Sequence, residues 1–122
     1  MTALLTTARI VCKSPEARAT AIAAFRDIIA YAIPNEPDVL QYICAVPLDD
    51  ASGTEIYMIE EYASQAASTA HIATPPVQAL LALFASGAVL AHAPEVHTST
   101  VHKKCSSGSP FPLSSNPAIM LV

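Results

Sequence analysis

The sequence predicts an α+β fold in which four strands and two helical regions follow one another in the order βαββαβ. Four segments are rich in Val, Ile, Thr and Tyr, which favour strands. Serine and proline residues mark the places between these segments where helices begin and end. This order is that of the split βαβ motif, so we expect a ferredoxin-like, four-stranded antiparallel sheet with its helices on one face.

The first strand is predicted for residues 4–13, and the first helix follows it directly. Ser14 can cap this helix, and Pro15 suits its first turn because that position has no intrahelical N–H bond to lose. Glu16 places a negative charge at the positive end of the helix dipole. The helix is expected to run to about Ala32. Its apolar stripe consists of Ile22, Phe25, Ile29 and Ile33.

The first helix is expected to stop at Pro34, because a proline inside a helix removes a backbone N–H donor. Residues 39–47 and 54–62 are then predicted as the second and third strands. The loop between them, residues 49–53, contains Asp, Ser and Gly, which accept turn geometry. We therefore expect a hairpin.

A broken helical region and a last strand complete the predicted fold. Ser64 is expected to cap a short helix over residues 64–72, which the Thr-Pro-Pro run at residues 74–76 interrupts. A second helical piece is predicted for residues 76–86. The fourth strand is predicted for residues 95–103, which are rich in Thr and Val.

The two strands at the centre of the chain are apolar on both faces. A sheet with helices on one face and water on the other normally alternates between apolar and polar residues. Residues 39–47 break this rule, since one side carries Leu40, Tyr42, Cys44 and Val46 and the other Val39, Ile43 and Ala45. One layer of helices covers only one face of the sheet. We therefore expect a homodimer in which a second sheet covers the other face.

Length and composition narrow the function classes. With 122 residues the chain has room for one domain, predicted for residues 1–104. The net charge of −4 argues against nucleic-acid binding. No apolar run reaches the roughly 18 residues of a membrane span. Three widely spaced cysteines and the lack of a signal-peptide pattern predict reduced thiols and a cytoplasmic location.

Residues 105–122 differ in composition from the predicted domain. They are rich in Ser and Pro but end in five apolar residues, Ala118–Val122. Burying the apolar groups near Phe111 and at this end would offset part of the entropy lost on ordering the segment. We expect a C-terminal arm that docks on the dimer.

Residues 57–75 resemble the signature of antibiotic biosynthesis monooxygenase domains. The run Tyr-Met-Ile-Glu-Glu-Tyr at residues 57–62 is followed by Ala-Ser-Gln-Ala-Ala and then by Ala-His-Ile-Ala-Thr-Pro. The family pattern is roughly Y-x-x-E-E-W-x-S-x-x-A, then A-H-x-x-S-P and an amphipathic helix. The resemblance extends over about residues 4–104. It implies a dimeric α+β barrel with an apolar pocket between the sheet and the helices of each subunit.

The family implied by this resemblance contains several activities. It includes cofactor-free oxygenases of aromatic polyketides, haem-degrading enzymes and quinol oxygenases, and cyclases share the barrel, so the fold does not fix the reaction. Tyr62 stands where the family usually has Trp, and the chain has no Trp, which argues against haem degradation. Pro76 and Val77 stand where plant polyketide cyclases of this barrel carry a His, which argues against that activity.

His71 and Tyr62 are the predicted catalytic residues. An imidazole can take a phenolic or enolic proton near neutral pH, and a phenol can donate a hydrogen bond to a substrate carbonyl. The alternative is structural: His71 would hold the backbone where the helix breaks, and Tyr62 would be an amphipathic residue at a strand end. The residues predicted to bind substrate are Met58, Glu60, Tyr42, Leu81 and Phe84.

No metal or cofactor site is predicted. The remaining histidines are scattered, and the three glycines lie far apart, so neither a ligand cluster nor a phosphate loop is formed. The predicted function is a small cofactor-independent tailoring enzyme that oxygenates an aromatic or polyketide-like substrate. Two alternatives stay open: a cofactor-free cyclase or isomerase, and a non-catalytic dimeric protein that binds a small molecule.

Overall fold

The computed structural model describes residues 3–105 and confirms the predicted βαββαβ order, with the second helical region split in two. Residues 1–2 and 106–122, and with them the predicted docking of the C-terminal arm, lie outside the described residues. The elements are β1 (Leu4–Val11), α1 (Pro15–Asn35), β2 (Val39–Ala45), β3 (Glu55–Tyr62), α2 (Gln65–Ile72), α3 (Pro75–Ala85) and β4 (Glu95–Thr100).

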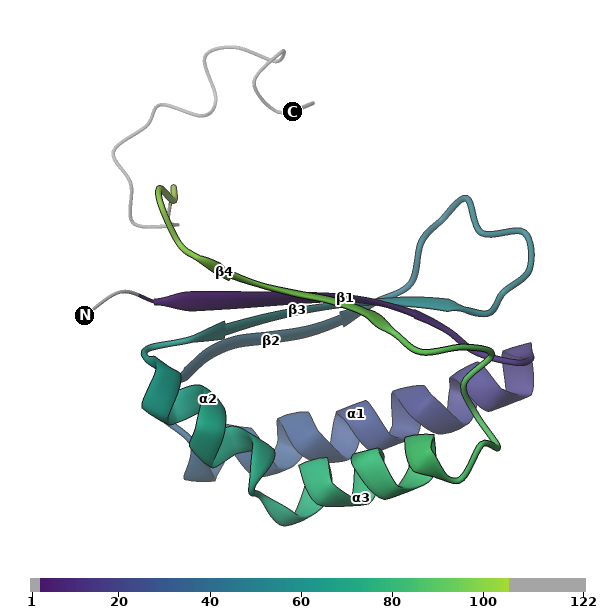
Figure 1. Cartoon of the computed structure of the whole chain (residues 1–122), viewed down its shortest axis with the longest axis horizontal. Coiled ribbons are helices and arrows are strands. Elements are labelled where there is room, and N and C mark those ends of the chain that lie inside the picture. The colour runs from purple at the N-terminus through teal and green to yellow at the C-terminus, as the bar shows by residue number, and fades with distance from the viewer. Residues whose placement is uncertain (1–2, 106–122) are drawn as a thin grey trace, which may run out of the picture.

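The four strands form one antiparallel sheet in the order β2-β3-β1-β4, and all three helices lie against one face of it (Figure 1). This is the ferredoxin-like α+β fold that the sequence predicts. The last strand ends at Thr100, earlier than expected, because its partner β1 begins at Leu4, opposite Thr100. Within the described residues no helix is long and apolar enough to cross a membrane.

Helix α1 continues past its predicted end: it includes Pro34 and ends at Asn35. The prediction was wrong because a proline in the last turn removes only one donor, and nearby groups keep the turn bonded. The Asn35 side-chain amide donates to the Tyr31 carbonyl at 2.9 Å, and the Glu36 N–H donates to the Ala32 carbonyl at 2.8 Å. Glu36 is therefore held at the end of the helix.

The hairpin between β2 and β3 is organised by Asp50, as the turn residues of the loop suggest. Its carboxylate accepts hydrogen bonds from the side chain and N–H of Ser52 and from the N–H groups of Thr54 and Glu55. These bonds lower the pKa of Asp50 to about 2, and the bond from the Ser52 hydroxyl has the largest effect. Gly53 follows with a φ of +67°, a conformation that side-chain-bearing residues rarely adopt.

The hydrophobic core lies between the sheet and helices α1 and α3. Side chains of one parity on β1 and β3 point into it, and α1 buries Phe25 and Ile28. The predicted apolar stripe of α1 is wrong at Ile33, which is 79% exposed, because the helix turns the face of Ile28 toward the sheet. The largest fully buried side chains are those of Phe25, Ile28, Ile56, Met58, His71 and Cys12. A histidine in this set is unusual, because an imidazole has two nitrogens that need partners.

The sheet face turned away from the helices, here called the open face, keeps apolar groups in water. Ile43 and Tyr57 are 42% and 41% exposed on it, as expected if a further layer is needed. Glu61 also belongs to this face, but it is buried beneath the segment after β4, where Lys104 Nζ contacts both carboxylate oxygens at 3.0 Å. Glu60 and Glu61 therefore occupy opposite faces, as their spacing predicts.

Candidate functional site

A cavity of about 310 Å³ lies between the sheet and the helices, and its walls come from every strand and from all three helices. Its lining is mostly apolar and includes a smaller number of polar groups, which is the usual composition of a small-molecule site. All seven predicted site residues line it: His71, Tyr62, Met58, Glu60, Tyr42, Leu81 and Phe84. The structure thus brings together residues that lie up to 42 positions apart in the sequence, from Tyr42 to Phe84.

His71 lies in the last turn of α2, and its side chain is only 2% exposed. Its ring is flanked by the rings of Tyr42 and Tyr62, with centroids 5.0 and 5.3 Å away. Its backbone carbonyl accepts from the Thr74 hydroxyl at 2.7 Å, which fixes the break before α3. The backbone of His71 therefore holds the helix break, as the structural alternative expects, and the residue also lines the cavity.

The two nitrogens of His71 differ in their surroundings. Nδ1 lies 3.0 Å from Glu36 Oε1. Because an ionised carboxylate can only accept a hydrogen bond, this contact makes Nδ1 the donor, and in the neutral form of the ring Nε2 then carries the lone pair. Nε2 is buried and has no hydrogen-bond partner among the described residues. A buried imidazole with an unused lone pair beside a cavity is suited to accept a proton from a bound molecule.

Glu60 and Tyr62 form a second polar pair in the cavity wall. The Tyr62 hydroxyl donates to Glu60 Oε1 at 2.5 Å. Burial raises the pKa of the Glu60 carboxyl, and the Tyr62 hydrogen bond opposes part of this rise. Burial, together with the nearby Glu60 charge, also raises the pKa values of Tyr42 and Tyr62 well above the ordinary value. Both phenols stay protonated near neutral pH and can act as hydrogen-bond donors.

The raised pKa of Glu60 predicts a pH effect on stability. The folded chain binds this proton more tightly than the unfolded chain, so the folded form loses stability as pH rises through the raised value. Glu60→Gln removes the buried charge but keeps an acceptor for Tyr62. We expect this variant to be more stable than the wild type at pH 7, with an advantage that shrinks as the pH falls toward 4.5. Urea unfolding across this range measures it.

The control for this experiment is Asp27→Asn, which removes an exposed carboxylate from α1. It should change stability little and leave the pH dependence like that of the wild type. A Glu60→Gln variant whose stability parallels the wild type at every pH would show that Glu60 is well solvated in the folded protein.

Glu36 is the site residue that sequence reasoning missed. In the sequence it is an acidic residue between two prolines, Pro34 and Pro37, and nothing near it in the chain indicates a contact with His71. Its side chain is 11% exposed, and Oε2 has no hydrogen-bond partner among the described residues. The carboxylate of Glu36 and the ring of His71 are 35 positions apart in the sequence. Their contact can therefore be found only from the packing of α1 against α2.

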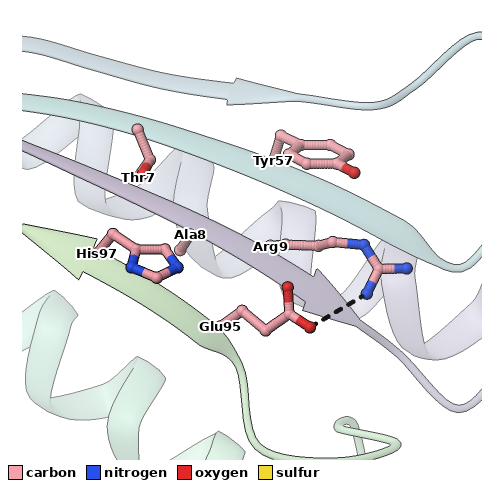
Figure 2. A pocket seen from close by; sticks show the side chains of 6 residues that line it. All are labelled: Thr7, Ala8, Arg9, Tyr57, Glu95 and His97. Carbon is pink, nitrogen blue, oxygen red and sulfur yellow. Dashed lines mark ion pairs between the residues drawn. The ribbon is translucent and has the colours of Figure 1, made fainter.

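The other histidines do not join this site. His97 lies on the open face of the sheet, where it lines a hollow of about 230 Å³ together with Arg9, Tyr57 and Glu95 (Figure 2). Arg9 pairs there with Glu95 at 3.9 Å and with Glu55 at 2.5 Å. Among residues 3–105, no group of three or more His, Cys, Asp or Glu side chains is placed to hold a metal ion.

Solved structures share this fold. A candidate antibiotic biosynthesis monooxygenase from Caulobacter crescentus superimposes with a TM-score of 0.71 and 24% identity, over 84% of this chain and 92% of that one. The protein Rv0793 from Mycobacterium tuberculosis gives a TM-score of 0.72 at 22% identity, over 85% of this chain and 99% of that one. At these identities the likeness shows the fold.

Family membership rests on the sequence. No curated protein matches the chain. The family model for antibiotic biosynthesis monooxygenase, however, matches residues 12–83, which is more than half of the chain and includes His71, Tyr62 and Glu36. The chain therefore belongs to the antibiotic biosynthesis monooxygenase family, as the residues at 57–75 led us to expect.

Proposed function

We propose that the chain is a cofactor-independent monooxygenase that acts on a small aromatic or polyketide-like molecule in the cavity between sheet and helices. The observation that carries this proposal is the buried His71 ring, which has no partner for Nε2 among the described residues and belongs to the wall of a mostly apolar cavity. Family membership supports the reaction class, and the candidate monooxygenases among the structural neighbours are consistent with it.

The proposed reaction begins with proton transfer. His71 Nε2 takes a proton from an acidic C–H or O–H group of the substrate, and the resulting anion is electron-rich enough to react with O₂. For a CH₂ group activated by neighbouring rings or carbonyls, one oxygen atom ends in the new C=O group and the other leaves as water. The substrate supplies all four electrons, so the balance requires no external reductant.

The cavity walls have suitable properties for this chemistry. The protonated phenol of Tyr42 can donate a hydrogen bond to the oxygen on which negative charge develops in the substrate anion. Tyr62 donates its single O–H to Glu60, so it would serve as a donor to substrate only after exchanging that partner. Met58, Leu81 and Phe84 provide apolar surface that excludes water and holds a flat ring system. The site therefore combines one base, phenolic donors and a dry cavity.

Oxygen uptake tests the proposal. The wild-type protein is incubated under air with anthrone, and dissolved oxygen is followed with an electrode. Anthrone is the keto tautomer of a hydroxyaromatic compound and has an acidic CH₂ group. We expect uptake above the protein-free rate and a ketone product with one added oxygen. If anthrone binds but uptake equals the protein-free control, the oxygenase assignment is wrong and the chain is a binding protein. Turnover without uptake would instead identify a cyclase or isomerase.

We also propose that two copies associate through their open faces. Ile43 and Tyr57 are exposed there, and Arg9 is already paired with Glu55 and Glu95, so this face can be covered without leaving that charge unpaired. A second sheet over this face would remove its exposed apolar groups from water, and this burial would supply most of the favourable free energy of association.

The dimer is tested by sedimentation. We expect the wild type to sediment as a dimer at micromolar concentration and Tyr57→Asp to sediment as a monomer, because the substitution would bury an unpaired charge at the centre of the interface. The matched control is Ile33→Asp, which adds the same charge at a 79% exposed position of α1, away from the open face. A wild type that sediments as a monomer would overturn the proposal.

A further inference from the structure

Polar side chains form one row across the sheet on the floor of the inner cavity. Each strand contributes one residue, and each residue is the antiparallel partner of the next one across the sheet. The members of this polar row, in sheet order, are Tyr42, Glu60, Thr6 and Thr98, and all four line the cavity. The oxygen atoms of the floor are therefore gathered at one level of the sheet.

The next row of side chains on the same face is apolar. Two residues further along its strand, Ala8 pairs with Met58 on one side and with Val96 on the other, and these three also line the cavity. Two residues of a strand advance about 7 Å, which is close to the length of two fused aromatic rings. The cavity floor therefore presents a polar edge and an apolar surface beside it, on the scale of one small aromatic molecule.

Glu60 is the charged member of the polar row. Its Oε1 accepts the Tyr62 hydroxyl at 2.5 Å, which holds the carboxylate in place. Its Oε2 receives no hydrogen bond from the described residues and keeps accessible surface. A charged oxygen in a mostly apolar cavity needs a donor, and a hydroxyl group of a bound molecule forms a strong, charge-assisted hydrogen bond with it.

We propose that Glu60 is the specificity-determining residue of the cavity, with Oε2 accepting a hydrogen bond from a phenolic hydroxyl of the ligand while the ring system lies on the apolar row. This inference rests on the proposed function, because it concerns the same cavity, and it names the substrate class. The ligand is a fused aromatic compound with a hydroxyl group on one edge and no polar group on the opposite edge. Anthrone meets this description in its hydroxyaromatic tautomer.

Binding of two matched probes in the absence of oxygen tests the proposal. 2-Naphthol and 2-fluoronaphthalene share one ring system, and only the first has an O–H group; their Kd values are measured by fluorescence titration. We expect the wild type to bind 2-naphthol about tenfold more tightly, because the analogue leaves Oε2 without a donor.

Variants at position 60 assign this preference to the carboxylate. Glu60→Leu has no acceptor and should lose the preference, whereas Glu60→Gln keeps an uncharged acceptor and should show an intermediate one. Asp27→Leu makes a similar exchange at an exposed position of α1 and should keep the wild-type ratio of the two Kd values. A wild type that binds both probes equally, or a Glu60→Leu variant that keeps the full preference, overturns the inference.

Oxygen uptake with anthrone judges the oxygenase proposal separately. Uptake by a protein that shows no preference between the probes would refute only the role of Glu60. A preference that depends on Glu60, without uptake, would support this inference and refute the oxygenase assignment.

A measurement on the wild type keeps the inference testable if Glu60→Leu does not fold. Nuclear Overhauser effects with bound 2-naphthol report which ring protons lie near which methyl groups. We expect the protons beside the hydroxyl to contact the Thr6 methyl group and those of the unsubstituted ring to contact the Met58 methyl group. Contacts in the reverse order would show that the hydroxyl points away from the polar row and would contradict the proposal.

Discussion

The His71→Ala variant is expected to lose about 10²–10⁴-fold in kcat, the range that a positioned general base contributes. The cavity would keep its apolar walls and both phenols, so the KM for anthrone should change much less than kcat. Oxygen-uptake kinetics at several anthrone concentrations separate the two constants. A variant that retains more than half of the wild-type kcat would show that His71 has only its structural role.

A control is needed because His71 is buried and its loss also removes a packed ring. Leu81→Ala changes the same cavity at a 45% exposed position and removes apolar surface without touching a proton-transfer group. We expect this variant to raise KM and to leave kcat within a few-fold of the wild type. Urea unfolding of both variants shows whether lost activity follows lost stability.

The Ile28→Ala variant is expected to lower the free energy of unfolding by about 2–5 kcal/mol, because it leaves a cavity in a well-packed core. Ile28 lies on the face of α1 that packs in the hydrophobic core, and its side chain is completely buried. Ile33→Ala is the matched control: it makes the same chemical change on the same helix, at a position that is 79% exposed. We expect it to change stability by less than about 0.5 kcal/mol.

Urea-induced unfolding followed by circular dichroism measures both effects. Equal losses for the two variants would contradict the observed placement of α1, in which Ile28 is buried and Ile33 is exposed. A large loss for Ile33→Ala alone would indicate that this end of α1 is covered by another chain in solution.

Much of the fold could be predicted because its signals are local. Ser14 and Ser64 accept hydrogen bonds from the N–H groups of Ala17 and Ala67, as expected of helix caps. Asp50 and Gly53 form the hairpin turn that the residue types at 49–53 favour. The parity of β3 placed Met58, Glu60 and Tyr62 on one face, and all three line the cavity. Each of these signals lies within a few residues of the element that it determines.

The bounds of the elements were less predictable, because they depend on partners. Helix α1 passes through Pro34 since side-chain and backbone bonds to the carbonyls of Tyr31 and Ala32 keep its last turn closed although Pro34 has no donor. Strand β4 stops at Thr100 because β1, its partner, begins opposite that residue. Neither cause is visible in the residues of the element itself.

The sequence by itself determined the βαββαβ order, the hairpin and the family, and it named a histidine, a tyrosine and a set of apolar residues as a candidate site. Only the tertiary structure decided that Glu36 contacts His71, 35 positions away, so that Nδ1 is occupied and Nε2 is the nitrogen without a partner among the described residues. The physical reason is that the periodicity of a helix or strand fixes which face a side chain occupies, whereas the partner of a buried polar atom depends on how separate elements pack.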